Sequence, residues 1–235
     1  MRNWFSLDNR ESTEFGVYIS GGGTYGAPTR SVDMISVPGR DGDLIASGTR
    51  QENMELTYPA FIKSDFDENL ADLRAWLMAT QSYRRLWDTY HQEEYRLAVY
   101  LGGLSPNVTP TKRAGKFDIT FSVKPQRWLL SGEKVKTFTA SGTIKNPTLF
   151  RARPLIRIYG AGEVGIGAET ITVTAADGYT DIDCDAMESY KDSVSRNTYV
   201  RFSGNDYPTI GPGKVDITLG TGITKVEITP RWWTA

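Results

Sequence analysis

The sequence predicts a mainly β protein made of two parts, with a single α-helix in the first part. Three observations support this class. Apolar residues alternate with polar ones along several short segments, which is typical of half-buried strands. Glycine, proline and asparagine separate the segments of the second part at roughly the 8–12-residue spacing of sandwiches and barrels. Only one stretch has the apolar periodicity of a helix.

The first part begins with short strands around a turn-rich sequence. Residues 17–19 form one strand, which ends at three consecutive glycines, and residues 32–37 form the next. Proline presets φ and glycine accepts positive φ, so residues 38–42 (PGRDG) predict a hairpin-like turn that leads into a strand at 43–45. Alternation at 54–60 predicts another half-buried strand.

Residues 65–80 carry the predicted helix. Apolar residues recur there at spacings of three and four, at Phe66, Leu70, Leu73, Trp76 and Leu77. Ser64 is expected to cap the helix, with Asp67 three residues later, and the acidic first turn suits the positive end of the helix dipole. We expect this helix to cover one face of a sheet.

Strands resume at 84–87, 96–101 and 116–123, and the last of these alternates cleanly. A polar stretch between residues 131 and 143 then marks a change in composition. We place a domain boundary in it, which divides the chain into residues 1–135 and 136–235. The second part has no convincing helix, and its expected strands include 155–159, 170–174, 198–202, 215–219 and 225–228.

The composition argues against several classes of protein. The chain has 27 basic and 28 acidic residues, and neither part has the basic excess of a nucleic-acid-binding domain. A single cysteine, Cys184, allows no intrachain disulfide, and a single histidine, His91, allows no zinc site built on several such ligands. We expect His91 at the surface or at a hairpin tip. No membrane span or signal peptide is expected, so folding should take place in a cytoplasm.

Residues 160–165, GAGEVG, match the G-x-G-x-x-G pattern of dinucleotide sites, and Asp181, Asp183 and Asp185 follow at about the required spacing. In such a site the third glycine opens a helix whose N-terminus meets the pyrophosphate. Here threonine alternates with isoleucine and valine at 170–174, which is typical of a strand. The motif therefore predicts a glycine-rich connection between two antiparallel strands, and no cofactor is expected.

The same aspartates resemble the start of a calcium-binding loop. Such a loop needs glycine at its sixth position and a carboxylate at its twelfth; this sequence has Ala186 at the sixth and Asp192, in place of the usual glutamate, at the twelfth. Ile182 and Cys184 alternate with the aspartates, so we expect a strand with one acidic exposed face and a buried structural thiol. No metal site is expected, and no catalytic residues are identified, since no G-x-S-x-G elbow occurs.

Two adjacent tryptophans, Trp232 and Trp233, lie near the end of the sequence. Adjacent residues of a strand face opposite ways, so at most one of the two packs into the same core. The other is a candidate carbohydrate platform or interface anchor. A packed C-terminal strand is the alternative.

Four stretches, in order along nearly the whole chain, resemble the siphophage distal tail protein (Dit) family. They are 37–44 (VPGRDGDL), 146–150 with 153–160 (NPTLF and RPLIRIYG), 181–190 (DIDCDAMESY), and 208–213 with 226–233 (PTIGPG and VEITPRWW). The resemblance implies an N-terminal β-rich belt domain with one α-helix, which forms a ring, and a C-terminal galectin-like β-sandwich.

The resemblance also implies a structural, non-enzymatic role. Members form hexameric rings at the distal end of the tail, between the tail tube protein and the tail-associated hub, fibre or receptor-binding proteins, and DNA passes through the channel. We expect a homo-hexamer, as a single ring or as stacked rings, that is assembled in the host cytoplasm and resides in the virion. We assign inter-subunit or inter-ring contacts to one turn, made of Pro38, Gly39, Arg40, Asp41, Gly42 and Asp43.

The galectin-like sandwich leaves one alternative open, a carbohydrate-binding module that recognises host cell-surface polysaccharide. The galectin type of site usually relies on His, Asn, Arg, Glu and Trp side chains, and the second part has no histidine. A chain of 235 residues also has little room for an inserted binding module. We therefore expect a short, architectural protein.

Overall fold

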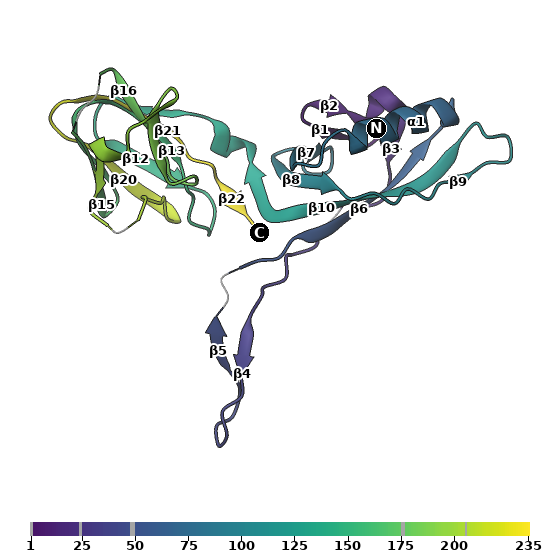
Figure 1. Ribbon diagram of the computed structural model, residues 1–235, viewed down its shortest axis with the longest axis horizontal. Coiled ribbons are helices and arrows are strands. Elements are labelled where there is room, and N and C mark those ends of the chain that lie inside the picture. The colour runs from purple at the N-terminus through teal and green to yellow at the C-terminus, as the bar shows by residue number, and fades with distance from the viewer. Residues whose placement is uncertain (1, 24, 48–49, 175–176, 205) are drawn as a thin grey trace. The chain divides into compact units, whose positions relative to one another are not determined.

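The computed structural model describes residues 2–23, 25–47, 50–174, 177–204 and 206–235, and it divides into two compact units (Figure 1). The first unit is Met1–Arg127 with Ala235, and the second is Trp128–Thr234. The division falls inside one long strand, β10 (Gly115–Leu129). The mainly β fold predicted from the sequence is confirmed, whereas the domains assigned to 1–135 and 136–235 stay a prediction.

A sheet in the order β2-β1-β7-β8-β10-β6-β3 forms the frame of the first unit, and β9 pairs with the first residues of β10. A 3-10 turn, η1 (Ser12–Phe15), lies between β2 and β3. The strands that join β10 in this sheet are β1 (Phe5–Leu7), β2 (Arg10–Glu11), β3 (Val17–Ile19), β6 (Met54–Ile62), β7 (Arg84–Asp88), β8 (Glu94–Tyr100) and β9 (Asn107–Val108).

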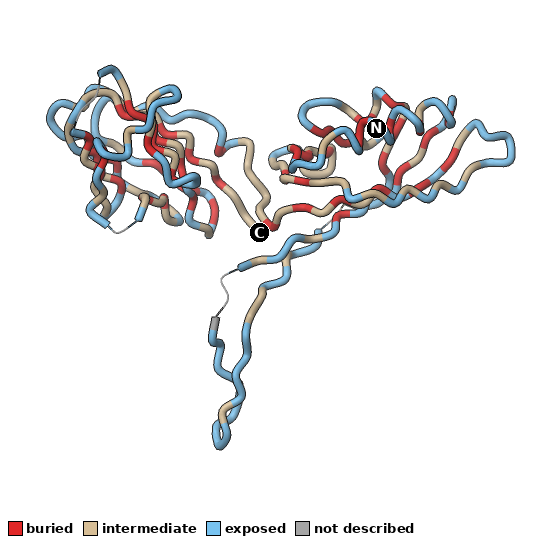
Figure 2. The backbone as a smooth tube through the Cα atoms, in the orientation of Figure 1, coloured by how far each residue is buried: buried red, intermediate tan, exposed pale blue. Residues whose placement is uncertain are grey.

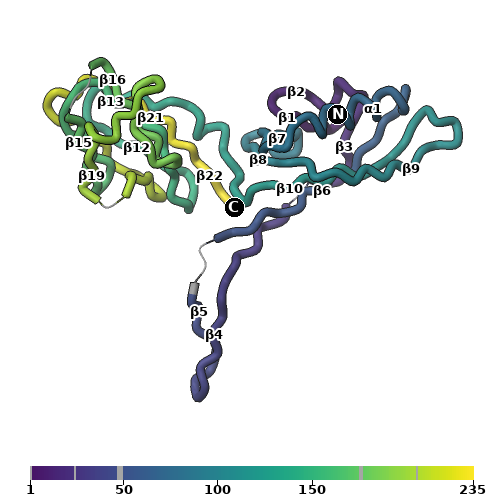
Figure 3. The backbone as a smooth tube through the Cα atoms, viewed as in Figure 1, coloured from purple at the N-terminus to yellow at the C-terminus, as the bar shows by residue number. Residues whose placement is uncertain are grey.

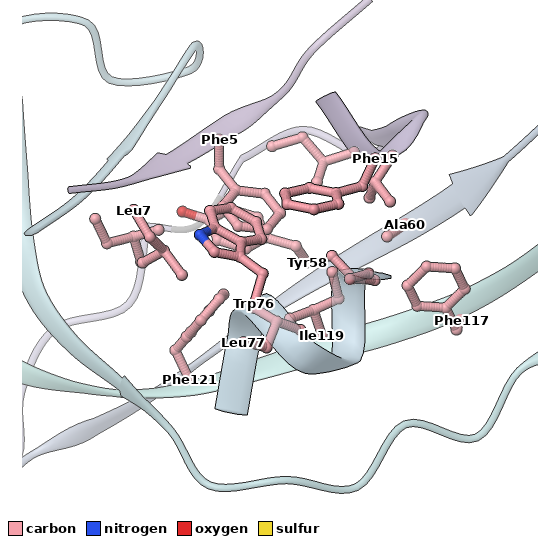
Figure 4. Packing of buried hydrophobic residues seen from close by; sticks show 14 of the residues in the cluster. Phe5, Leu7, Phe15, Tyr58, Ala60, Trp76, Leu77, Phe117, Ile119 and Phe121 are labelled. Carbon is pink, nitrogen blue, oxygen red and sulfur yellow. The ribbon is translucent and has the colours of Figure 1, made fainter. Parts of the chain in front are cut away.

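Strands β6 and β10 show why this sheet has one buried face. They pair antiparallel, with Ile119 opposite Tyr58. Successive side chains point to opposite faces, so one face is apolar and buried in the core, and the other is more exposed and mostly polar; Figure 2 shows the alternation of burial along the strands. Figure 4 shows the apolar side packed with aromatic rings, among them Phe5, which stacks on Tyr58 with 5.7 Å between ring centroids. The alternation predicted for 54–60 and 116–123 is confirmed.

Helix α1 (Phe66–Met78) confirms the helix predicted at 65–80, and its five apolar positions are buried as the periodicity requires. The predicted Ser64 cap is wrong. The N-cap is Asp65, whose backbone is left-handed at φ 52° and whose side chain makes no capping hydrogen bond. Asn69 Nδ2 donates instead to the Ser64 carbonyl at 2.9 Å. At the other end, the buried Arg84 guanidinium donates to carbonyls of the last helical turn, which suits the negative end of the helix dipole.

The second unit is a sandwich of two sheets, and its core takes buried residues from both. One sheet runs β11-β21-β13-β16-β17-β18 and the other β12-β20-β14-β15-β19. The elements of this unit are η2 (Leu130–Glu133), β11 (Lys136–Phe138), β12 (Gly142–Asn146), β13 (Leu155–Gly160), β14 (Gly162–Ile166), β15 (Glu169–Val173), β16 (Tyr179–Asp183), β17 (Glu188–Lys191), β18 (Val194–Ser195), η3 (Asn197–Tyr199), β19 (Val200–Phe202), β20 (Gly213–Leu219), β21 (Ile223–Thr229) and β22 (Trp233–Thr234).

The GAGEVG sequence was predicted to be a connection between two strands, and the structure differs from this prediction. Residues 162–166 are themselves strand β14, which pairs with β15, and the chain reverses after Ile166. Gly160 and Gly162 mark the crossing from one sheet to the other. A Cβ on Gly160 would lie 2.1 Å from the Gly222 carbonyl oxygen, so the glycine permits a close approach of two backbones. The motif is thus structural, with β15 as the returning strand.

Candidate functional site

The predicted contact turn lies at the tip of a separate two-stranded hairpin, β4 (Asp33–Ile35) and β5 (Leu44–Ser47), which we call the arm (Figure 3). The arm begins at a β-bridge between Arg30 and Gln51. Its tip holds Pro38, Gly39, Arg40, Asp41, Gly42 and Asp43, all of them exposed. Gly39 and Gly42 have φ of 80° and 77°, which explains the two glycines of the turn. The predicted hairpin is therefore confirmed, and its contact role stays a prediction.

The arm exposes large apolar side chains on both of its faces. Met34 pairs with Ile45 and Ile35 pairs with Leu44, so each pair shares one face. Their exposed fractions are 60%, 71%, 51% and 39%, respectively. A two-stranded hairpin without a packed face is marginal in water. The arm therefore has the character of a segment that is covered in a larger assembly.

These four apolar residues were not singled out from the sequence, although a signal was present. A half-buried strand alternates apolar and polar residues, whereas this hairpin carries apolar residues at adjacent positions, 34–35 and 44–45. Adjacent apolar residues place one side chain on each face. In a hairpin that lies outside the main sheet, both faces are then exposed.

A second apolar surface of the first unit is a groove between the end of β6 and the β9–β10 hairpin. Its volume is about 520 Å³. Apolar side chains and backbone form most of its surface, and two lysines lie among the lining residues, which include Phe61, Val108, Pro110, Ala114, Lys63 and Lys116. The groove is thus suited to an apolar segment that carries negative charge at its end.

Two aspartates of strand β16 pair with arginines from other segments of the second unit. Arg157 binds Asp181 through two hydrogen bonds of 2.7 and 2.8 Å, and Arg231 binds Asp183 in the same way with the same distances. The hydrogen bonds from Arg231 lower the pKa of Asp183. The prediction of one acidic exposed face is wrong, because the arginines pair with the carboxylates and Asp181 is buried. Cys184 is buried as predicted.

The two tryptophans differ in burial, and only Trp233 lies in a strand, β22. Trp232 is buried in the core of the second unit. Trp233 is partly exposed, its ring lies 4.3 Å from that of Phe150, and its Nε1 donates to the Arg151 carbonyl at 3.0 Å. Trp233 is therefore the one of the two that could meet a partner, and a role in an interface or sugar site stays a prediction for both.

A buried carboxylate, Asp88, orders the turn after β7. Its Oδ2 accepts a hydrogen bond of 2.6 Å from the Tyr58 hydroxyl, and its Oδ1 accepts the backbone N–H groups of Tyr90 and His91, each at 2.8 Å. Burial, together with the neighbouring Asp88, raises the pKa of Tyr58. His91 lies in this turn and is partly buried, with Nδ1 3.3 Å from the same carboxylate oxygen. The hydrogen bonds that Asp88 accepts therefore hold the turn after β7 in place.

Within the described ranges, no group of three or more His, Cys, Asp or Glu side chains could hold a metal ion. No helix of the described chain is long and apolar enough to cross a membrane. The candidate site is the pair of apolar surfaces on the first unit, the exposed arm and the groove.

Comparison with solved structures finds the same fold in components of phage tails. The chain is similar to the SPP1 Dit protein, described as a paradigm of the hub adsorption apparatus in phages that infect Gram-positive bacteria. The TM-score is 0.74 at 14% sequence identity, over 97% of this chain and 98% of that one. It is also similar to a chain of the phage P2 baseplate in its activated, calcium-containing conformation, with a TM-score of 0.50, 10% identity, and 97% of each chain covered. No protein-family model and no curated protein matches the sequence.

Proposed function

We propose that this chain is the structural hub of a siphophage tail tip, a hexameric ring that joins the tail tube to the adsorption apparatus and leaves a channel for DNA. One observation carries the proposal, the Dit fold with a TM-score of 0.74 over 97% of this chain and 98% of the SPP1 hub protein. Because the likeness includes nearly all of both chains, the proposal applies to the two units together.

The surfaces of the first unit support assembly into a ring. An exposed apolar arm and an apolar groove are different surfaces of the same unit. A contact between two different surfaces of identical chains is heterologous, and it generates a ring when the rotation between copies closes. A large exposed apolar surface is uncommon on proteins that remain monomers.

The polar face of the main sheet supports a channel through which DNA passes without binding. On β6 and β10 this face carries threonines and side chains of both charges, among them Glu55, Thr57, Lys116 and Asp118. The net charge of the chain is −1. Nucleic-acid binding depends on neutralising phosphates with an excess of lysine and arginine, which this chain does not have.

The role that we propose is non-enzymatic. The side chains and the motif that suggest catalysis or ligand binding in the sequence have structural roles. Asp181 and Asp183 are paired with arginines, His91 and Asp88 order a turn, and the GAGEVG sequence forms a strand. The carbohydrate-binding alternative has weaker support, because Trp232 is buried and the Trp233 ring rests against Phe150.

The partners that follow from this role are further copies of the chain, in one ring or in stacked rings, the tail tube protein above, and a tail-associated hub, fibre or receptor-binding protein below. The chain would be assembled in the host cytoplasm and would reside at the distal tail tip of the virion. Pro38–Asp43, at the tip of the arm, would contribute to contacts between subunits or rings.

Light scattering and electron microscopy of the full chain test this proposal. We expect a mass of six times the 26.2 kDa of one chain, and closed rings with an open centre in the images. A chain that remains at 26.2 kDa at high protein concentration would contradict the ring. Replacing Arg40 and Asp41 together should impair assembly while each subunit keeps its far-ultraviolet circular dichroism spectrum.

A further inference from the structure

The arm and the groove lie at opposite ends of one strand. Strand β6 begins at Met54, close to the arm base at Gln51, and it ends at Ile62, which lines the groove. A strand of nine residues extends roughly 26 Å, at about 3.3 Å for each step. The arm therefore leaves one end of the unit, and the groove opens at the other. This arrangement suits a head-to-tail contact between neighbouring copies.

The groove has the size and the surface to accept apolar side chains of the arm. A cavity of roughly 150 Å³ holds one benzene-sized group, so about 520 Å³ has room for roughly three. Gly115 lines the groove, and the core residue Phe66 packs so closely against it that a Cβ there would lie 2.4 Å from the Phe66 ring. The side chains of Phe61 and Val108 are partly buried and contribute apolar surface. Burial of Met34 and Ile45, the most exposed pair of the arm, would remove water from both surfaces.

Charges at the two surfaces are complementary. The arm carries Asp41 and Asp43 at its exposed tip, next to Arg40. Lys63 and Lys116 are exposed and line the groove. An apolar pair that enters the groove would bring the aspartates of the tip towards these lysines. Complementary charges set orientation and association rate, and their effect weakens as salt is added.

We propose that the arm of one copy seats in the groove of the next copy, with Met34 and Ile45 in the groove and Asp41 and Asp43 near Lys63 and Lys116. This inference rests on the proposed ring and names the contact that builds it. Each chain supplies one arm and one groove, so the contact uses all arms when the ring closes. A second copy of the chain is thus the occupant of the groove, because it covers one arm for every groove that it fills.

Cysteine cross-linking tests the contact directly. Chains with Ile45→Cys are mixed with chains that carry Val108→Cys, and a mild oxidant is added to the full-length proteins. The native Cys184 should stay silent, because it is buried and burial raises its pKa to about 12. We expect a disulfide-linked dimer in the mixture. The matched control replaces Ile45→Cys with Leu149→Cys, at a residue of the second unit that is 89% exposed, and should give no more than background.

A charge placed in the groove provides an independent measurement. Ile45→Lys places a positive charge beside Lys63 and Lys116 and removes an apolar contact, so it should raise the dissociation constant of the assembly at least about tenfold, as expected for a central hot-spot residue. Leu149→Lys should leave it within about twofold. Rings of wild-type stability in Ile45→Lys, or a cross-link no stronger than the control, would overturn the arm contact and leave the ring standing. A wild-type chain that never assembles would overturn both.

Discussion

Asp183 ties strand β16 to the last residues of the carboxy-terminal unit, and its replacement has a calculable effect. The carboxylate accepts two hydrogen bonds from Arg231, at 2.7 and 2.8 Å, and two from the backbone N–H groups of Asp185 and Ala186, at 3.0 and 3.1 Å. Its side chain is only 15% exposed. We predict that Asp183→Asn destabilises this unit, because the amide keeps the shape but removes the charge and one acceptor oxygen.

The magnitude follows from the lost hydrogen bonds. A hydrogen bond to a charged group contributes about 1.5–3 kcal/mol, and asparagine retains part of the network through its remaining oxygen. A loss of about 2–3 kcal/mol in the free energy of unfolding is therefore expected. Since about 1.4 kcal/mol corresponds to a factor of ten, the open state of this unit should become roughly 30- to 150-fold more populated.

Cys184 provides an assay that reports on this unit alone. It is the single cysteine of the chain, it follows Asp183 directly, and it is buried in the sandwich core. A thiol reagent can label it only when the unit opens. When closing is faster than labelling, the labelling rate is proportional to the open population. The labelling rate of Cys184 in Asp183→Asn should thus rise roughly 30- to 150-fold, once it is divided by the labelling rate of the same thiol in the unfolded chain.

The matched control is Asp185→Asn, which removes the same charge from an exposed side chain two residues away. Its labelling rate should stay within about twofold of the wild type. If Asp183→Asn labels less than about threefold faster than the wild type, the pair contributes under about 0.7 kcal/mol, and the structural reasoning fails.

Three further predictions concern pH, the helix end and a glycine. Because Arg231 lowers the pKa of Asp183, the stabilisation is present at neutral pH and is lost as pH falls through the folded pKa, below the unfolded value of about 3.9. The labelling difference between wild type and Asp183→Asn, measured with an acid-tolerant disulfide reagent, should therefore shrink below about pH 4. Arg84→Met leaves two carbonyls of α1 without their donor and should cost about 1–3 kcal/mol, seen as earlier melting of the 222 nm signal. Gly160→Ala should destabilise the second unit by about 1–3 kcal/mol more than Gly178→Ala, because both glycines have positive φ but only the first meets backbone at 2.1 Å; equal Cys184 labelling rates would refute this reasoning.

The features that were predicted correctly depend on local patterns. The alternation at 54–60 and 116–123 placed β6 and β10, and the spacing of apolar residues placed α1, because burial of one face imposes these periods. Turn chemistry at 38–42 likewise predicted the β4–β5 hairpin. Each of these signals lies within one element of the chain.

The features that were missed depend on distant parts of the chain. The aspartates of β16 were predicted to form an exposed acidic face. Their arginine partners lie 24 and 48 residues away in the sequence, so no local pattern indicated the pairing. Glycine is required at position 160 because the backbone of Gly222, 62 residues later in the sequence, approaches it closely. The N-cap at Asp65 was misplaced because a left-handed backbone there replaces the expected side-chain cap. Exposure of the arm depends on its place outside the main sheet.

We propose that this chain is the hub at the distal tip of a siphophage tail. Gold-labelled antibodies against the chain, applied to intact virions that contain it, test this role most directly. We expect gold particles at the distal end of the tail in electron micrographs, and no label on virions treated with a non-immune antibody. Label over the capsid or along the whole tail, or virions with no label at all, would contradict it.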